Sequence, residues 1–123
     1  MDRETFKIHE KEEVGEVHIS NEVVAIIGGL AATEVEGFAG MVGTLKGDIV
    51  ELLGRKNLSK GVLVEVGEDS VSLSLSIIVD FGANIPDVTK NIQEKVKLAV
   101  ETMTGLKVDE VNIRVADVNL GQK

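Results

Sequence analysis

The sequence predicts an α+β domain in which a small mixed sheet carries two helices packed on one face. Two patterns favour this class. Residues 71–79 alternate between apolar residues and mainly serines, which is typical of a strand with one buried face. Residues 21–36 and 86–104 instead repeat their apolar residues at helical spacing. The length of 123 residues suits one domain, and the predicted element order is β-α-β-β-α-β.

The first half of the chain is expected to supply a strand and a helix. Residues 14–19 predict a short, half-buried strand, and Ser20 or Asn21 can cap the helix that follows. Small alanines keep this helix slim where it touches a neighbour. Its larger apolar residues recur at helical spacing, and they are Val23, Ile26, Ile27 and Leu30.

Glycines mark both the interior and the end of this helix. Gly28 and Gly29 each lower the helix propensity by about 1 kcal/mol. A helix that keeps both is expected to pack its backbone closely against a neighbour. Gly37 is predicted to end the helix. The glycine-rich residues 37–47 then predict a loop, and residues 48–53 a short helical turn.

The second half of the chain carries the clearer patterns. Residues 62–66 and 71–79 predict two strands that are joined by a turn of hairpin length. Pro86 marks the start of a long helix and Gly105 its end. The apolar residues of this helix recur at helical spacing, and they are Val88, Ile92, Val96, Ala99, Val100 and Met103. Residues 111–115 alternate again and predict a last strand.

The composition excludes several classes of function. The chain has no cysteine, so disulfides, thiolate metal sites and cysteine nucleophiles are excluded. A net charge of -8 and only 2% aromatic residues argue against nucleic acid as a partner. No apolar run approaches the roughly 20 residues of a membrane-spanning helix. We therefore expect a cytoplasmic protein without direct membrane insertion, which reaches the membrane only through a partner.

No group of residues predicts catalysis. The two histidines, His9 and His18, lack the further converging ligands that a metal site needs. The serines of the alternating strand have no nucleophile-elbow sequence around them. We therefore predict that the chain is not an enzyme and has no catalytic residues, no cofactor and no metal site.

The segment from Glu34 to Val42 is the strongest candidate for a binding site. Its Gly-Phe-Ala-Gly sequence matches the GxxG clamp of an RNA-binding KH domain, but Glu34 and Glu36 would repel phosphate. An exposed Phe38 and Met41 beside glycines would suit a patch that binds a protein partner. In the alternative, both side chains fold back onto the core. The candidate partner-binding residues are Glu34, Glu36, Gly37, Phe38, Gly40 and Met41.

Six stretches of the chain, taken together in order and spacing, carry a family resemblance. They are GEVHIS from Gly15, AATEVEGFAGM from Ala31, KGVLVEV from Lys60, FGANIP from Phe81, IQEKV from Ile92 and TGLKVDEVNIRV from Thr104. With them the chain resembles the bacterial alkaline shock protein family, also called the envelope stress response family. The resemblance covers residues 14–118, which we take as one domain. Residues 1–13 are then a flexible N-terminal arm, or a frayed edge strand around Phe6 to Ile8, and residues 119–123 a C-terminal tail.

The resemblance implies a function that rests on protein–protein contacts, in Gram-positive bacteria and without enzymatic activity. It implies a scaffold or adaptor in cell-envelope stress response or homeostasis, held at the membrane by a small membrane-anchored protein. The alternative it implies is a regulator that binds a lipid-metabolism enzyme, either acetyl-CoA carboxylase or fatty-acid kinase. The element order also resembles ring-building modules of secretion and sporulation machines, which makes a homo-oligomer a further hypothesis.

Overall fold

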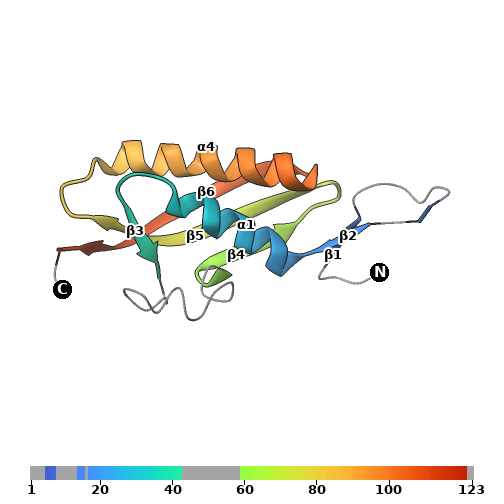
Figure 1. Ribbon diagram of the computed structural model, residues 1–123, viewed down its shortest axis with the longest axis horizontal. Coiled ribbons are helices and arrows are strands. Elements are labelled where there is room, and N and C mark those ends of the chain that lie inside the picture. Colours follow the sequence, from blue (N-terminus) through green and yellow to red (C-terminus); the bar gives the residue numbers. More distant parts are fainter. Residues whose placement is uncertain (1–4, 8–13, 16, 43–58, 122–123) are drawn as a thin grey trace.

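The computed structural model describes residues 5–7, 14–15, 17–42 and 59–121 of the chain. Figure 1 shows two helices lying against a long, twisted sheet. The elements in chain order are β1 (Thr5–Lys7), β2 (His18–Ser20), α1 (Asn21–Thr33), β3 (Phe38–Met41), β4 (Val62–Val66), β5 (Ser70–Asp80), α4 (Ile85–Thr104) and β6 (Lys107–Asn119).

Strand β5 is the centre of a four-stranded mixed sheet. One edge of β5 pairs with β6 in parallel. The other edge is shared by two shorter antiparallel strands, because β4 pairs with the first half of β5 and β3 with the second half. Strands β1 and β2 form a separate antiparallel pair. The predicted α+β class and the mixed sheet are confirmed, whereas the predicted order lacked β3. Strand β1 overlaps the edge strand that the sequence offered around Phe6 to Ile8.

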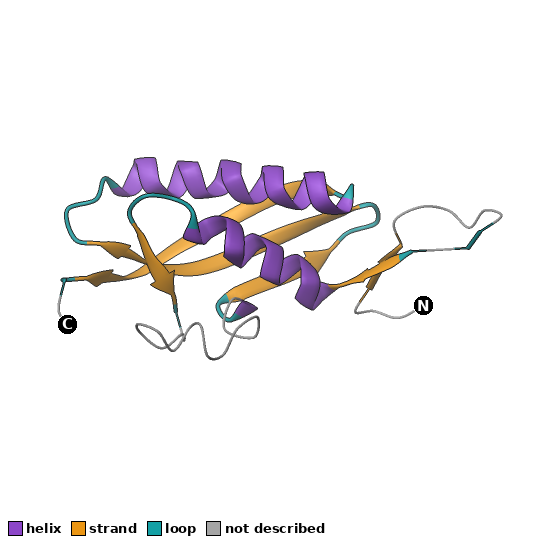
Figure 2. Ribbon diagram, viewed as in Figure 1, coloured by secondary structure: helices purple, strands orange, loops and turns teal. Residues whose placement is uncertain are grey.

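Both helices cover the same face of the sheet, as Figure 2 shows. The inward residues of β5 pack beneath them and are at most 1% exposed, and they are Val71, Leu73, Leu75, Ile77 and Val79. The serines that alternate with them lie on the opposite face. Helix α4 adds its own buried stripe to this core, with Val88, Ile92, Val96 and Val100. The alternation in residues 71–79 therefore predicted the inner and outer faces correctly.

Helix α1 turns its small residues toward the core. A Cβ atom added to Gly28 would lie 2.8 Å from Leu73 Cδ2 and 3.5 Å from Val96 Cγ1, so the helix backbone does pack closely against its neighbours, as predicted. The larger side chains on other faces of α1 stay partly in solvent, since Val23 is 45% and Leu30 is 50% exposed. Of the four apolar residues at helical spacing, Ile27 is therefore in the core, whereas Val23 and Leu30 are not.

The ends of the helices follow the capping residues. Ser20 Oγ accepts a hydrogen bond from the Val23 N–H at 3.2 Å, which decides between the two predicted caps of α1. Gly105 ends α4 with φ of 78°, as predicted. Helix α1, however, ends at Thr33 and not at Gly37. It ends early because the chain turns at once, with the Val35 N–H donating to Ala32 O, and buries the Val35 side chain.

Two further corrections concern short strands. Residues 38–41 are strand β3, although the glycines around them predicted a loop. Strand β4 pairs only with the first half of β5, and β3 pairs with the second half along the same edge of β5. A register shift between Phe38 and Gly40 hides the strand pattern in the sequence. The strand predicted at 14–19 is shorter, because β2 covers only His18–Ser20. The predicted turn at 48–53 lies outside the described residues.

Candidate partner-binding surface

The segment that follows α1 divides into an acidic surface part and a buried part. Glu34 and Glu36 are exposed, whereas Met41 is 3% exposed and lies in the core. Phe38 is half-buried and packs against the same core. The Met41 side chain thus folds back onto the core, which is the second of the two arrangements that the sequence allowed. In this conformation Glu34, Glu36 and the open side of Phe38 are the parts of the segment that stay accessible.

Two glycines allow this segment to lie close to the rest of the molecule. Gly37 has φ of 95°, and a Cβ atom there would lie 2.6 Å from Val88 Cγ2. Only glycine suits both this backbone conformation and this space. Gly40 lies at the register shift of β3. Gly37 therefore lets the acidic residues lie beside α4. Partner binding by the six predicted residues stays a prediction.

A groove lined mainly by apolar side chains lies between α1 and α4. Its volume is about 580 Å³. Four of the side chains that line it are strongly exposed: Val23 at 45%, Leu30 at 50%, Leu98 at 67% and Met103 at 69%. Contiguous exposed apolar side chains of this kind are typical of a contact site for another molecule.

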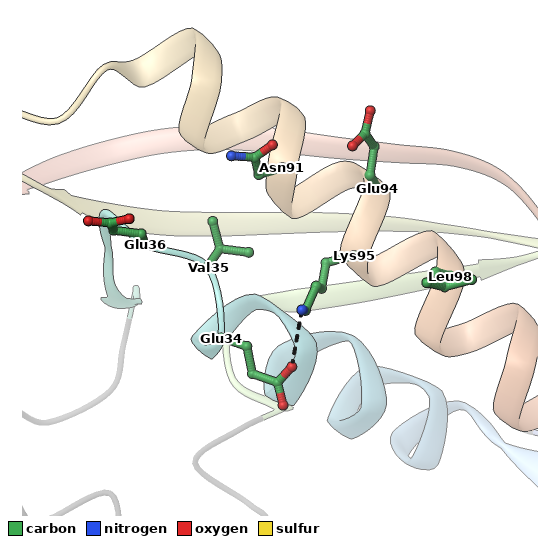
Figure 3. A pocket seen from close by; sticks show the side chains of 7 residues that line it. All are labelled: Glu34, Val35, Glu36, Asn91, Glu94, Lys95 and Leu98. Carbon is green, nitrogen blue, oxygen red and sulfur yellow. Dashed lines mark ion pairs between the residues drawn. The ribbon is translucent and has the colours of Figure 1, made fainter.

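The acidic segment adjoins one end of this groove. A second hollow of about 390 Å³ shares Glu34, Lys95 and Leu98 with the groove and adds Glu36 and Glu94. Figure 3 shows the Lys95 and Glu34 side chains reaching toward each other from α4 and from the end of α1. Their Nζ and Oε1 atoms are 3.6 Å apart. The lining of this second hollow therefore has three carboxylates and one ammonium group, and only Glu34 pairs with Lys95, which leaves this end of the groove acidic.

The first half of β6 is tied to α4 through its backbone. Gln93 Nε2 donates a hydrogen bond to Val111 O at 2.9 Å, and Lys97 Nζ donates to Val108 O at 3.3 Å. The Val108 N–H donates to Glu101 Oε2 at 3.0 Å. This last bond, helped by the nearby Lys97 ammonium, lowers the pKa of Glu101 below its ordinary value of 4.5. These backbone groups of β6 are thereby bonded to the protein's own helix.

The described residues offer little else for chemistry. They contain no group of three or more His, Asp or Glu side chains placed to hold a metal ion. Ser72, Ser74 and Ser76 lie in a row on the face of β5 that points away from the helices. Among the described helices, none is both long and apolar enough to cross a membrane.

Sequence reasoning missed most of the groove. The pattern indicates only a helical spacing for Val23 and Leu30, and it places Met103 in the apolar stripe of α4. That stripe does not include Leu98. One signal could have found them. Helix α1 carries apolar residues on more than one face and a small Gly/Ala face as well, so only part of its apolar surface can meet one sheet.

Comparison with known proteins places the chain in a sequence family. Residues 9–120 match the model of the alkaline shock protein 23 family, which is described as having a cell envelope-related function. The chain is 36% identical to YqhY of Bacillus subtilis over 115 residues, which covers 94% of the chain and 85% of YqhY. It is also 31% identical over 105 residues to a stress response regulator gls24 homolog of Streptococcus pyogenes. This match covers 85% of the chain but 59% of that protein.

The fold is also similar to that of a solved domain. A variant of the MamM CTD in its zinc form superposes with a TM-score of 0.50 at 16% sequence identity. The match covers 83% of this chain and 90% of that domain. At this identity the likeness concerns the fold alone.

Proposed function

The chain belongs to the alkaline shock protein 23 family, whose function is related to the cell envelope, and we propose that it acts there as a scaffold or adaptor through protein–protein contacts. The membership confirms the resemblance that the sequence carries. The proposed role is non-enzymatic and belongs to envelope stress response or homeostasis. It takes place on the cytoplasmic side of the membrane.

The apolar groove between α1 and α4 is the observation that carries this proposal. Leu98 and Met103 expose about two thirds of their surface beside Val23 and Leu30. Water contact with such a row costs free energy that a bound protein would recover. The groove adjoins Glu34 and Glu36, so the groove and the predicted binding segment can form one continuous contact surface.

The proposed partner is a small membrane-anchored protein, as the family resemblance implies. The chain would be brought to the membrane by this contact, without inserting into it. We also propose that copies of the chain associate with one another. Size-exclusion chromatography with light scattering tests that part, and a strict monomer at high protein concentration would contradict it.

Site-specific crosslinking in the native host tests the proposed function. A photo-crosslinking amino acid replaces Leu98 in the groove or, as the matched control, Leu63, which is 61% exposed on the opposite face of the sheet. We expect crosslinks from position 98, in the membrane fraction, to a small anchored protein. Recovery in the soluble fraction of carboxylase or fatty-acid kinase subunits would replace the scaffold with the metabolic regulator. Absence of any protein crosslink from either face would overturn the proposed function.

A further inference from the structure

We propose that the groove between α1 and α4 binds an amphipathic helix of the partner, oriented by basic residues at the acidic end of the groove. This inference rests on the proposed function and adds the chemistry of the partner to it. It says that apolar side chains of the partner helix fill the groove. It also says that Lys or Arg side chains at one end of that helix meet Glu34, Glu36 and Glu94.

The walls of the groove favour a helix over an extended peptide. Both walls are α-helices, whose interior backbone N–H and C=O groups are already hydrogen-bonded within each helix. An extended peptide would find no backbone partners there and would leave its own polar groups unpaired as it loses water. A helix satisfies its own backbone and presents only side chains. Strand addition at the start of β6 is also hindered, because Val108 and Val111 already bond to α4.

The length of the groove sets the length of the partner helix. The groove follows α1 from Val23 to Glu34 and faces Lys95 to Met103 on α4. At 1.5 Å per residue, the α1 wall is about 16 Å long, which corresponds to about three helical turns. A partner helix of that length would place three or four apolar residues in the groove, at the i, i+3, i+4 and i+7 spacing of such complexes.

The charges give the groove a direction. At the end marked by Val23 and Met103, the lining is apolar apart from Thr102. At the other end, the residues that line the adjoining hollow include Glu34, Glu36 and Glu94 but a single basic residue, Lys95, which pairs with Glu34. Opposite charges at one end of a contact site select partner and register more than they add affinity. A partner helix with basic residues at that end is therefore favoured.

The same charges disfavour a second copy of this chain as the occupant. A dimer formed through this groove would bury Glu34, Glu36 and Glu94 of both copies, with one Lys95 from each copy as the basic residue among the lining side chains. The proposal therefore commits to a basic amphipathic helix from a different protein.

Designed peptides of about 15 residues test the proposal on the full-length chain, because three turns fill the groove and one further turn carries the end charges. The first has leucines on one helical face and three lysines at one end. The second replaces these lysines by glutamates, and the third keeps the lysines but spreads the leucines over all faces. Fluorescence anisotropy measures the dissociation constants. We expect the first peptide to bind about tenfold more tightly than each of the others.

Paired variants locate the binding site. Glu36→Lys with Glu94→Lys should invert the preference, so that the glutamate peptide binds more tightly than the lysine peptide. The control, Glu65→Lys with Glu110→Lys, changes the net charge equally on the opposite face of the sheet and should keep the preference. Leu98→Gln with Met103→Gln should weaken the lysine peptide about tenfold, whereas Leu63→Gln should not. Circular dichroism checks that each variant folds. Folding is expected because all the substituted positions are exposed.

Each contrary result overturns a stated part of the proposal. Equal binding of the lysine and glutamate peptides removes the basic end. Unchanged binding to the Leu98→Gln, Met103→Gln variant removes the groove, and equal binding of the spread-leucine peptide removes the helix. A dimer that dissociates when the lysine peptide binds would make the second copy the occupant. If the peptides fail while crosslinks from position 98 still reach a partner, the inference is lost and the proposed function stands.

Discussion

The two outer surfaces of the molecule are built from the same kind of periodic sequence, yet they expose different chemistry. The outer face of β5 presents Ser72, Ser74 and Ser76, which water solvates without cost. The outer surface of the helix layer presents Leu30, Leu98 and Met103, which are at least half exposed and gather in one groove. The helix layer thus gathers several exposed apolar side chains in one groove, whereas the outer face of the sheet combines the serines of β5 with the exposed Leu63 of β4.

This difference separates the apolar residues of the core from the exposed apolar residues of the groove. The inner face of β5 and the inner stripe of α4 form the core that stabilises the fold. Ile27 and Ala31 belong both to that core and to the groove lining. Val23, Leu30, Leu98 and Met103 instead stay exposed, so the stability of the core does not explain why these four are apolar. Substitutions that change one face of the molecule and leave the other face intact test this difference.

The largest effect is expected from neighbouring residues of β5 that point to opposite faces. Leu73 is 0% exposed, and Leu73→Ala should lower the free energy of unfolding by about 2–5 kcal/mol through lost burial and a cavity. Ser74→Ala should change it by less than about 0.5 kcal/mol. Urea denaturation measures both values. Similar decreases in the free energy of unfolding for the two variants would contradict the placement of Leu73 on the buried face and of Ser74 on the outer face.

A smaller effect is expected from two glycines with nearly the same backbone conformation. Gly37 and Gly82 have φ of 95° and 92°. Gly82→Ala should cost about 1–2 kcal/mol, because an added Cβ meets nothing within 4 Å and only the backbone is strained. Gly37→Ala should cost about 1–3 kcal/mol more, because its Cβ would press on Val88.

The same denaturation experiment decides this comparison. If the two alanine variants have equal stability, the turn after α1 does not press against α4. The acidic residues beside it would then be held less firmly at the end of the groove than proposed.

The smallest effect is expected from Glu101, whose carboxylate accepts the bond from the Val108 N–H. Its pKa in the folded chain lies below the ordinary value of 4.5. A lowered pKa stabilises the folded state at pH values above 4.5, and the contribution is lost as the pH falls through the folded pKa. The stability difference between the wild type and Glu101→Gln should therefore shrink over that acidic range. A Glu101 titration midpoint at or above 4.5, measured by NMR, would contradict this.

Much of the second half of the fold was predictable, because its patterns are local and regular. The alternation in residues 71–79 predicted β5 and its two faces, and Pro86 and Gly105 bounded the region of α4 correctly. The last strand was predicted too short, since Lys107–Asn119 includes two register shifts that interrupt its alternation. The first half was harder, because glycines in residues 37–41 resemble a loop until the free edge of β5 is known.

The sequence by itself determined the class of the domain, its family and the acidic character of its surface. These follow from periodicity, composition and the order of short motifs, all of which are present before the chain folds. Only the tertiary structure decided which apolar residues stay in solvent. The reason is that an apolar helix can turn any of several faces to a sheet, and here close packing of Gly28 against Leu73 turns the small face inward. That choice leaves Val23 and Leu30 to line a groove with residues of α4 that are far away in the sequence.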